Sequence, residues 1–401
     1  MTALLHYLNF GHETAILTQS PYYVPPENVR RMMNDLAFLP AWYGEAMDRV
    51  LIPYPLNAEF LDAIAPCYSN LAQPIVINND ELPINYAGVL KAAPWGLSLQ
   101  SINFFSKLHL KLGTSLDIPE WKNNYFTLCS RETAAACLDG VVKQLESLID
   151  PQITPTFCSA LDEVEQHLAT QSSTCLLKAP YSSSGRGLLW FDKLVITEAK
   201  RQWIAGVLKK QGCVSIEPAL NKQVDFALEF YSDGKGQVNC LGFSLFETAT
   251  QGGYTGSFIG TQTEIEDSLL KWVDKGSLES VKQAVIDQLG IKYTTYQGYL
   301  GVDMMIYQTE EGINKIHPCV EVNMRYTMGL VALRLSEKIV YRGSRGVLKI
   351  TYYPKSGEAL ANHLAMQKQY PAQFILSKLY SGYLNLCPID KDTSYCATLL
   401  I

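Results

Sequence analysis

Apolar and polar positions along the chain follow two periodicities, one typical of strands and one typical of helices. Apolar runs at 51–53 and 74–77 predict short buried strands, and the patterns at 29–36 and 58–64 predict helices. Helices that alternate with buried strands pack on the faces of a sheet. The first 125 residues are therefore expected to form an α/β domain.

A clear helix start opens the next region. Ser130 is a good N-cap, and a helix-forming run follows it to Leu138, before Gly140. Downstream, strands are predicted at 175–180, 188–191 and 214–220, with a helix at 198–210 and a β-rich stretch to about 247. The segment 248–260 is rich in Gly and Thr and is predicted to be a loop.

The pattern then predicts two helices within 268–289 and a hairpin with its turn at Gly312. Its strands are predicted at 299–307 and 315–323, and a helix follows at 327–338. Glu321 and Asn323 are two residues apart, so their side chains leave the same face of the strand. A hairpin symmetric about Gly312 would place Asp303 opposite Glu321.

Two carboxylates that face each other across a strand pair repel unless a cation compensates them. Two carboxylates and an amide oxygen suit Mg²⁺, so Asp303, Glu321 and Asn323 are candidate metal ligands. The same pattern also fits a solvated strand pair whose polar residues form its wet face. The sequence leaves both interpretations open.

A small polar loop follows the predicted strand that ends near Lys178. Ser183, Ser184, Gly185 and Gly187 belong to this loop, and such residues allow backbone N–H groups to approach phosphate oxygens. Lys178 would add a compact positive charge. A Walker A motif is excluded, because no G-K-[ST] follows and the next element is a strand. An ordinary flexible hairpin is the alternative.

Two further segments could complete a nucleotide site. At the end of a buried strand, Glu217 and Pro218 are followed by Ala219 and Leu220, and backbone groups left unpaired there can bond an adenine edge. Arg131 lies in the first turn of its helix, from which it can point into a cleft. Alone, each pattern also fits a plain strand end or a plain helix start.

Composition narrows the class of protein. The chain has 401 residues, 18% of them charged, and a net charge of −6, which argues against a broad nucleic-acid surface. The sequence shows neither a long apolar run nor a signal-peptide pattern. The ten cysteines form no C-x-x-C pair and the six histidines have no metal spacing. We expect a cytoplasmic protein with reduced thiols and no membrane partner.

In order and spacing, residues 126–335 resemble the ATP-grasp superfamily, which includes D-alanine–D-alanine ligase and biotin carboxylase. The strongest match is the segment EVNMRYTMG that begins at Glu321, which is similar to that superfamily's E-x-N-x-R motif. The resemblance implies that Asp303, Glu321 and Asn323 bind Mg²⁺ and that Arg325 contacts the γ-phosphate or an acyl phosphate. It also implies an α/β (α+β) ATP-grasp fold with an N-terminal α/β pre-ATP-grasp domain.

The same resemblance assigns further roles. Lys178 precedes the lid, which comprises residues 182–187; residues 217–220 form the adenine hinge, and Asp225 holds the ribose hydroxyls. Arg131 stands where the family often has Lys, and Gly301 stands where many members have a basic residue. The implied division is 1–125 for the N-terminal domain, 126–235 for lid and central subdomain, 236–350 for the C-terminal subdomain, and 351–401 for a tail packed on the core.

These expectations together predict an ATP- and Mg²⁺-dependent ligase. It would activate a small-molecule or peptide carboxylate as an acyl phosphate for attack by an amine, with Lys178 and Arg131 holding phosphates. The segment 252–256 either shapes the acceptor site or is only a connection. A kinase that phosphorylates a small molecule, and a nucleotide-binding protein without catalysis, remain alternatives. The oligomeric state is open, and a homodimer is one option.

Overall fold

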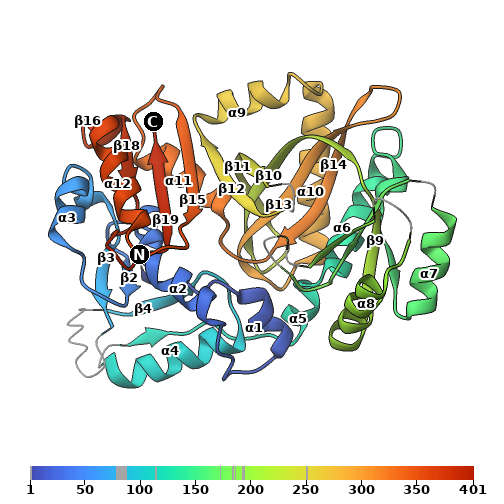
Figure 1. Ribbon diagram of the computed structural model, residues 1–401, viewed down its shortest axis with the longest axis horizontal. Helices are drawn as coiled ribbons and strands as arrows, with labels where there is room; N and C mark the ends of the chain where they lie inside the picture. The colour runs from blue at the N-terminus through green and yellow to red at the C-terminus, as the bar shows by residue number, and fades with distance from the viewer. Residues whose placement is uncertain are drawn as a thin grey trace. The chain divides into compact units, whose positions relative to one another are not determined.

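The computed structural model describes residues 2–77, 88–112, 115–171, 173–182, 185, 187–191, 195–249 and 252–401. Within them the chain forms two compact units (Figure 1). Unit 1 comprises residues 1–122, 255–264 and 325–401, and unit 2 comprises residues 123–254 and 265–324. The two units are coarser than the four-part division expected from the sequence, which stays a prediction.

The α-helices of the two units have the following bounds: α1 His12–Thr18, α2 Glu27–Asp35, α3 Ala58–Ile64, α4 Leu99–Leu112, α5 Asn124–Leu128, α6 Arg131–Gln144, α7 Leu161–Thr170, α8 Glu198–Gln211, α9 Gln262–Leu269, α10 Lys275–Lys292, α11 Met328–Lys338 and α12 Glu358–Gln369. The helices predicted around 29–36, 58–64, 198–210 and 327–338 are confirmed. Helix α6 runs through Gly140 without a break.

A parallel sheet of five strands forms the N-terminal part of unit 1. Its strands are β1 Ala3–Tyr7, β2 Arg49–Ile52, β3 Gln73–Val76, β4 Leu90–Pro94 and β5 Leu116–Asp117, in the order β3-β2-β1-β4-β5. Leu5, Leu51 and Ala92 from this sheet pack with Phe105 and Leu108 of α4 in one apolar core. The expected N-terminal α/β layer is therefore confirmed.

The C-terminal residues belong to the same unit. Antiparallel strands β12 Tyr254–Ile259, β15 Gly346–Tyr352, β19 Tyr395–Leu400 and β18 Tyr383–Asn385 are neighbours in that order, and β16 Gln373–Ile375 pairs with β17 Lys378–Ser381. The buried Trp42 indole donates a 2.6 Å hydrogen bond to the Leu386 carbonyl. This contact ties the end of the chain to its N-terminal part.

The prediction of a loop over 248–260 is wrong for residues 254–259, and residues 250–251 of that segment lie outside the described residues. Residues 254–259 form β12, whose Gly256 and Phe258 pair with Lys349 and Val347 of β15. The glycines suggested a loop, but tertiary pairing with a distant strand overrides local propensity. A Cβ on Gly256 would lie 2.6 Å from the Leu348 carbonyl, so close strand approach explains the glycine there.

Unit 2 contains two antiparallel sheets. The first has the order β14-β13-β10-β11, with β10 Asn221–Asp233, β11 Val238–Thr248, β13 Gln297–Gln308 and β14 Asn314–Asn323. The second, here called the lid sheet, has the order β6-β9-β7-β8, with β6 Thr156–Cys158, β7 Cys175–Lys178, β8 Leu188–Phe191 and β9 Val214–Pro218. Every strand predicted in this region is confirmed, with small shifts of its ends.

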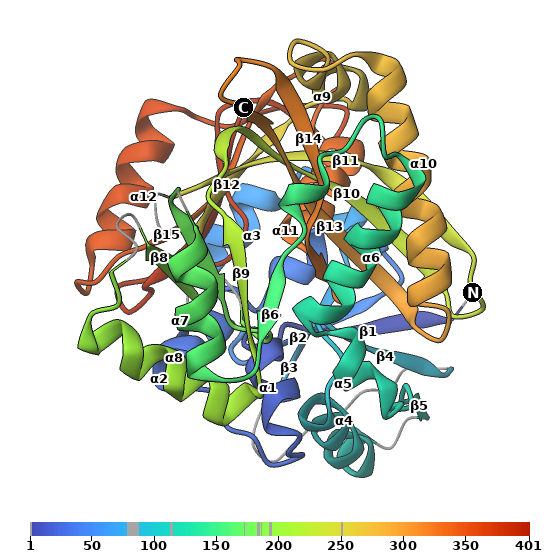
Figure 2. The same ribbon diagram turned by 90° about the vertical axis from the view of Figure 1, so that its right-hand side faces the viewer.

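The two faces of the lid sheet differ in what covers them. Figure 2 shows α7 and α8 side by side along this sheet, and Val164 and Ile204 from these helices pack on Leu177 and Ile216. The residues next to Leu177 and Ile216 along each strand point to the opposite face, because side chains alternate. Lys178, Ser215 and Glu217 therefore share the face that the helices leave uncovered.

Candidate nucleotide and metal site

The β13–β14 hairpin places the three candidate metal ligands together. Asp303 lies directly opposite Glu321, and Gly301 lies directly opposite Asn323. The Asn323 side-chain amide donates a 3.2 Å hydrogen bond to the Asp303 carboxylate. The predicted pairing of Asp303 with Glu321 is confirmed, and the side chains of Asp303, Glu321 and Asn323 leave one face of the sheet because of strand alternation.

The reason for this register differs from the one predicted. Near the turn, Gln308 pairs with Asn314 and Met305 pairs with His317, so the hairpin is centred on residue 311. Continued without interruption, that ladder would put Cys319 opposite Asp303. A bulge in β14, where residues 318–320 face Met304 alone, shifts the register and brings Glu321 into place. Pro318 lies in this bulge and has no N–H to donate to a ladder.

The uncovered face of the lid sheet carries an ion pair. Lys178 Nζ lies 2.5 Å from Glu217 Oε2, and the two side chains are 6% and 13% exposed. The Ser215 hydroxyl donates to Glu217 Oε1 at 3.2 Å. The strand register explains the cluster, because Lys178 is opposite Ser215 and Leu176 is opposite Glu217.

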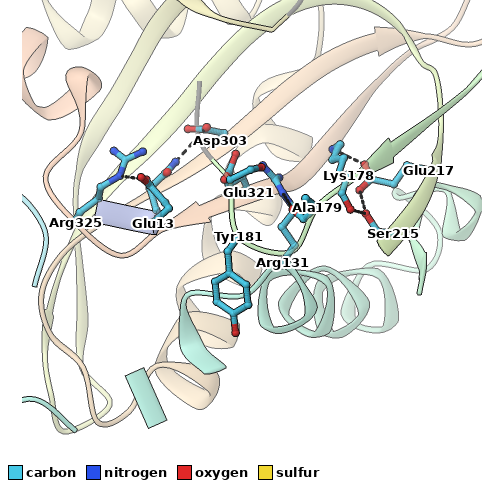
Figure 3. Close-up of polar contacts among 12 residues, drawn as sticks. Glu13, Arg131, Lys178, Ala179, Tyr181, Ser215, Glu217, Asp303, Glu321 and Arg325 are labelled. Atoms are coloured by element: carbon cyan, nitrogen blue, oxygen red, sulfur yellow. Dashed lines mark hydrogen bonds and ion pairs between the residues drawn. The ribbon is translucent and has the colours of Figure 1, made fainter. Parts of the chain in front are cut away.

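Arg131 links three elements of unit 2. Ser130 caps helix α6, as predicted, through its hydroxyl and the Glu132 N–H. From the first turn, Arg131 Nε donates to the Ala179 carbonyl at 3.1 Å, and another guanidinium nitrogen lies 3.0 Å from Glu321 Oε1 (Figure 3). The fork of Arg131 thus spans from the strand end after Lys178 to the β13–β14 hairpin.

The hinge and ribose candidates lie beside these groups. Strand β6 pairs with β9 only as far as Ile216, so Glu217 and Pro218 extend beyond that neighbour. Asp225 is opposite Met305 and therefore shares the face of Asp303. Its carboxylate binds Lys222 Nζ at 2.5 Å and the Thr248 hydroxyl at 2.8 Å.

The backbone at the other two hinge positions is already engaged. Ala219 N–H donates to the Thr174 carbonyl, and the Leu220 carbonyl accepts from Lys222 N–H. Of the lid candidates, Gly185 and Gly187 are described, and Ser183 and Ser184 lie outside the described residues. Gly185 has a φ of +73°, which favours glycine, and the Gly187 carbonyl accepts from Ala179 N–H. These contacts leave the predicted roles of hinge and lid as predictions.

Arg325 belongs to unit 1 and is held there by Glu13. Its Nε lies 2.7 Å from Glu13 Oε1, and the two side chains are 18% and 16% exposed. Burial raises the pKa of Glu13, but Arg325 and the neighbouring His12 outweigh burial and lower it to about 2. The sequence did not point to Glu13, since nothing local marks a partner more than 300 residues away.

Whether these residues fit a metal ion depends on their chemistry. Asp303, Glu321 and Asn323 offer only oxygen ligands on one face, as Mg²⁺ prefers. The repulsion between the two facing carboxylates is relieved by Arg131 at Glu321 and by the Asn323 amide at Asp303. Within the described residues, no group of three His, Cys, Asp or Glu side chains could hold a metal.

His317 lies close to the candidate residues, and the sequence did not single it out. It lies on β14 opposite Met305, is 4% exposed, and lines a pocket with Arg131 and Glu217. The only sequence signal was a histidine four residues before Glu321, which has no metal spacing.

Comparison with known proteins identifies the fold. The biotin carboxylase domain of 2-oxoglutarate carboxylase from Hydrogenobacter thermophilus, solved with MgADP and bicarbonate, matches with a TM-score of 0.51 and 10% identity over 100% of this chain and 86% of that chain. Biotin carboxylase from Campylobacter jejuni, solved with an ATP analogue, matches with a TM-score of 0.50 and 11% identity over 99% and 86%. An ADP complex of N5-carboxyaminoimidazole synthetase from Staphylococcus aureus reaches a TM-score of 0.49 at 12% identity over 100% and 92%.

No protein-family model matches the chain, and no curated protein matches it in sequence. The likeness to the two biotin carboxylases therefore concerns the fold, and it extends over nearly the whole chain. The predicted ATP-grasp fold is confirmed. No helix among the described residues is both long enough and apolar enough to cross a membrane.

Proposed function

Since the chain has the ATP-grasp fold, we propose that it is an ATP- and Mg²⁺-dependent ligase that activates a carboxylate as an acyl phosphate for attack by an amine. The observation that carries the proposal is the convergence of Asp303, Glu321 and Asn323 on one face of the β13–β14 hairpin. Bound there, Mg²⁺ would neutralise charge on the triphosphate. Small-molecule or peptide carboxylates and amines are the proposed substrates.

The ion pairs Lys178–Glu217 and Arg131–Glu321 fit this function. The phosphate candidates Lys178 and Arg131 are paired with Glu217 and Glu321. A triphosphate offers Arg131 a bidentate anionic partner, and a cation offers Glu321 a new positive partner. ATP and Mg²⁺ together can thus replace the Arg131–Glu321 pair without leaving either charge uncompensated.

The remaining residues would act through position and charge. Lys178 would neutralise phosphate oxygens, and Glu217 with the adjoining hinge would bind the base. Arg325 follows Asn323 by two residues, and its cation would stabilise charge that develops on the transferred phosphoryl group. Glu13 fixes the guanidinium of Arg325 in a defined orientation. A homodimer, the form in which the Hydrogenobacter biotin carboxylase domain was solved, is part of this proposal.

The test combines ADP release with product analysis. The purified chain is incubated with ATP, Mg²⁺ and a panel of amino acids and small carboxylates, and hydroxylamine is added to trap an acyl phosphate as a hydroxamate. Mg²⁺-dependent ADP release with hydroxamate formation supports the ligase. A stable phosphoester would identify the kinase alternative, and nucleotide binding without ADP release would identify a non-catalytic binding protein.

A further inference from the structure

The bulge in β14 decides which side chain faces Asp303. Residues 318–320 lie opposite Met304 alone, so β14 has two more residues than β13 over this stretch. Without this excess, Cys319 would lie opposite Asp303, and Glu321 would be displaced by two residues, about 7 Å along the strand. Mg²⁺ binds its oxygen ligands at about 2.1 Å, so a carboxylate displaced that far would no longer share one ion with Asp303. The proposed metal site therefore depends on what holds the bulge.

Cys319, in the middle of the bulge, makes one hydrogen bond through its backbone and another through its side chain. Its N–H, which pairs with no residue of β13, donates to Nδ1 of His317 at 3.4 Å. Its thiol donates to the Ala134 carbonyl of α6 at 3.5 Å. Cys319 is 3% exposed, so both bonds are shielded from bulk water. The bulge is thus held from within β14 and from a neighbouring helix.

The thiol contact joins the segments that carry Arg131 and Glu321. Ala134 lies three residues after Arg131, about one helical turn, and Cys319 lies two residues before Glu321. Cys137, about one turn further along α6, is a hydrogen-bonding neighbour of the same thiol. The contact between helix and bulge is therefore made directly beside the Arg131–Glu321 ion pair, whose atoms are 3.0 Å apart.

We propose that Cys319 is a positioning residue for the candidate metal site: its thiol fastens the β14 bulge to α6 and so keeps Glu321 opposite Asp303 and within reach of Arg131. This inference rests on the proposed function, because it concerns the same Mg²⁺ site. The thiol itself binds neither the ion nor the nucleotide. It acts through the placement of Glu321, which would bind the ion.

A buried cysteine can also serve packing alone, and suitable variants separate the two roles. Cys319→Val fills the space of the thiol but has no donor, whereas Cys319→Ser keeps a donor in a smaller side chain. Cys67→Val is the matched control, because the buried Cys67 thiol, in unit 1, donates to the Ile64 carbonyl at 3.3 Å. The control removes the same kind of bond elsewhere in the fold.

The first measurement needs no ligand and follows amide hydrogen exchange. In Cys319→Val, the amides of residues 319–323 are expected to exchange about fivefold faster than in the wild type, because one anchoring hydrogen bond is lost. In Cys319→Ser, exchange should return close to the wild-type rate. In Cys67→Val, exchange of residues 319–323 should be unchanged.

The second measurement is binding of Mn²⁺, as a probe for Mg²⁺, to the ADP-saturated chain by electron paramagnetic resonance. Cys319→Val should bind Mn²⁺ about tenfold more weakly, the lower end of the loss seen when residues that orient metal ligands are changed. Its affinity for ADP without metal should equal that of the wild type. Cys319→Ser should recover most of the Mn²⁺ affinity, and Cys67→Val should lose none.

The outcomes separate this inference from the proposed function. If Cys319→Val matches the wild type in exchange and in Mn²⁺ binding, the inference fails while the nucleotide site stands. If Cys319→Ser loses as much as Cys319→Val, or Cys67→Val shows the same losses, the thiol only packs and the inference fails as well. A wild type that binds no Mn²⁺ with ADP would refute the proposed function, and with it the role of Cys319 at the metal.

Discussion

The ion pairs Lys178–Glu217 and Arg131–Glu321 of unit 2 resemble each other in charge and differ in what they connect. Lys178 and Glu217 lie on neighbouring strands of the lid sheet and are both largely buried. Arg131 and Glu321 connect helix α6 to the β13–β14 hairpin, and Glu321 is 25% exposed. The first pair is a fixed part of one sheet, whereas the second spans two elements that a ligand could separate.

This difference predicts different roles for the two ion pairs, one in stability and one in ligand binding. Breaking a buried pair by removing one partner leaves a charge without compensation. Glu217 contacts Lys178 and Ser215 on the lid sheet, so the loss of Lys178 would cost stability. Glu321 faces Asp303 and Asn323 and would exchange Arg131 for a metal ion. The comparison predicts that the Arg131–Glu321 pair opens when Mg²⁺ and ATP bind and that the Lys178–Glu217 pair persists.

The strongest test of this comparison removes the charge of Glu321. Glu321→Gln should lower Mg²⁺-dependent ADP formation by about 100-fold or more, since even residues behind metal ligands cost 10- to 100-fold when changed. Affinity for ADP without Mg²⁺ should stay equal or rise, because Arg131 is no longer held. Glu310→Gln, at the exposed turn of the same hairpin, is the control. Unchanged ADP formation would remove Glu321 from the metal site.

Replacement of Lys178 tests the Lys178–Glu217 pair, which is expected to persist when Mg²⁺ and ATP bind. Lys178→Ala should weaken ATP binding about tenfold and lower the free energy of unfolding by about 3 kcal/mol, because Glu217 stays buried without its cation. The double variant Lys178→Met/Glu217→Gln should regain stability but not ATP affinity. Calorimetry and urea unfolding measure the two effects. Equal ATP affinity in Lys178→Ala would contradict its role at the phosphates.

Exchange of Arg131 for lysine tests the Arg131–Glu321 pair, and the expected loss of ATP affinity is smaller than for Lys178→Ala. Arg131→Lys keeps the charge but loses the planar fork that reaches both Ala179 and Glu321. We expect ATP affinity to fall by a factor of about five, with the unfolding transition little changed. Arg201→Lys, in an ion pair with Glu165 on the covered side of the lid sheet, is the matched control. An equal loss in both variants would show that the fork of Arg131 has no special role.

The buried histidines are expected to have the smallest effect on the free energy of unfolding near neutral pH. Burial, as the main cause, lowers the pKa of His12 and of His317 from 6.5 to about 4. A folded-state pKa below the unfolded value means that their contribution to stability is present above pH 6.5 and is lost as the pH falls towards 4. Urea unfolding should therefore show falling stability over that range. His317→Gln should reduce the slope, and an unchanged slope would refute the burial of a neutral ring.

Much of the candidate site could be predicted from local pattern. The period of two on β14 put Glu321 and Asn323 on one face, and the cap at Ser130 fixed the first turn that holds Arg131. The prediction of Asp303 opposite Glu321 was right although its reason was incomplete, since a bulge at 318–320 supplies the register. The loop predicted at 248–260 was wrong because its strand partner is almost a hundred residues away.

The sequence by itself determined the helices and strands that carry the candidate site and the residue types of the E-x-N-x-R segment, because propensity, capping and side-chain alternation act over a few residues. Only the tertiary structure decided that Arg131 pairs with Glu321, that Glu13 holds Arg325, and that His317 lines a pocket beside Glu217. These contacts join residues tens to hundreds of positions apart. Their formation depends on strand register and packing, which the whole folded chain sets.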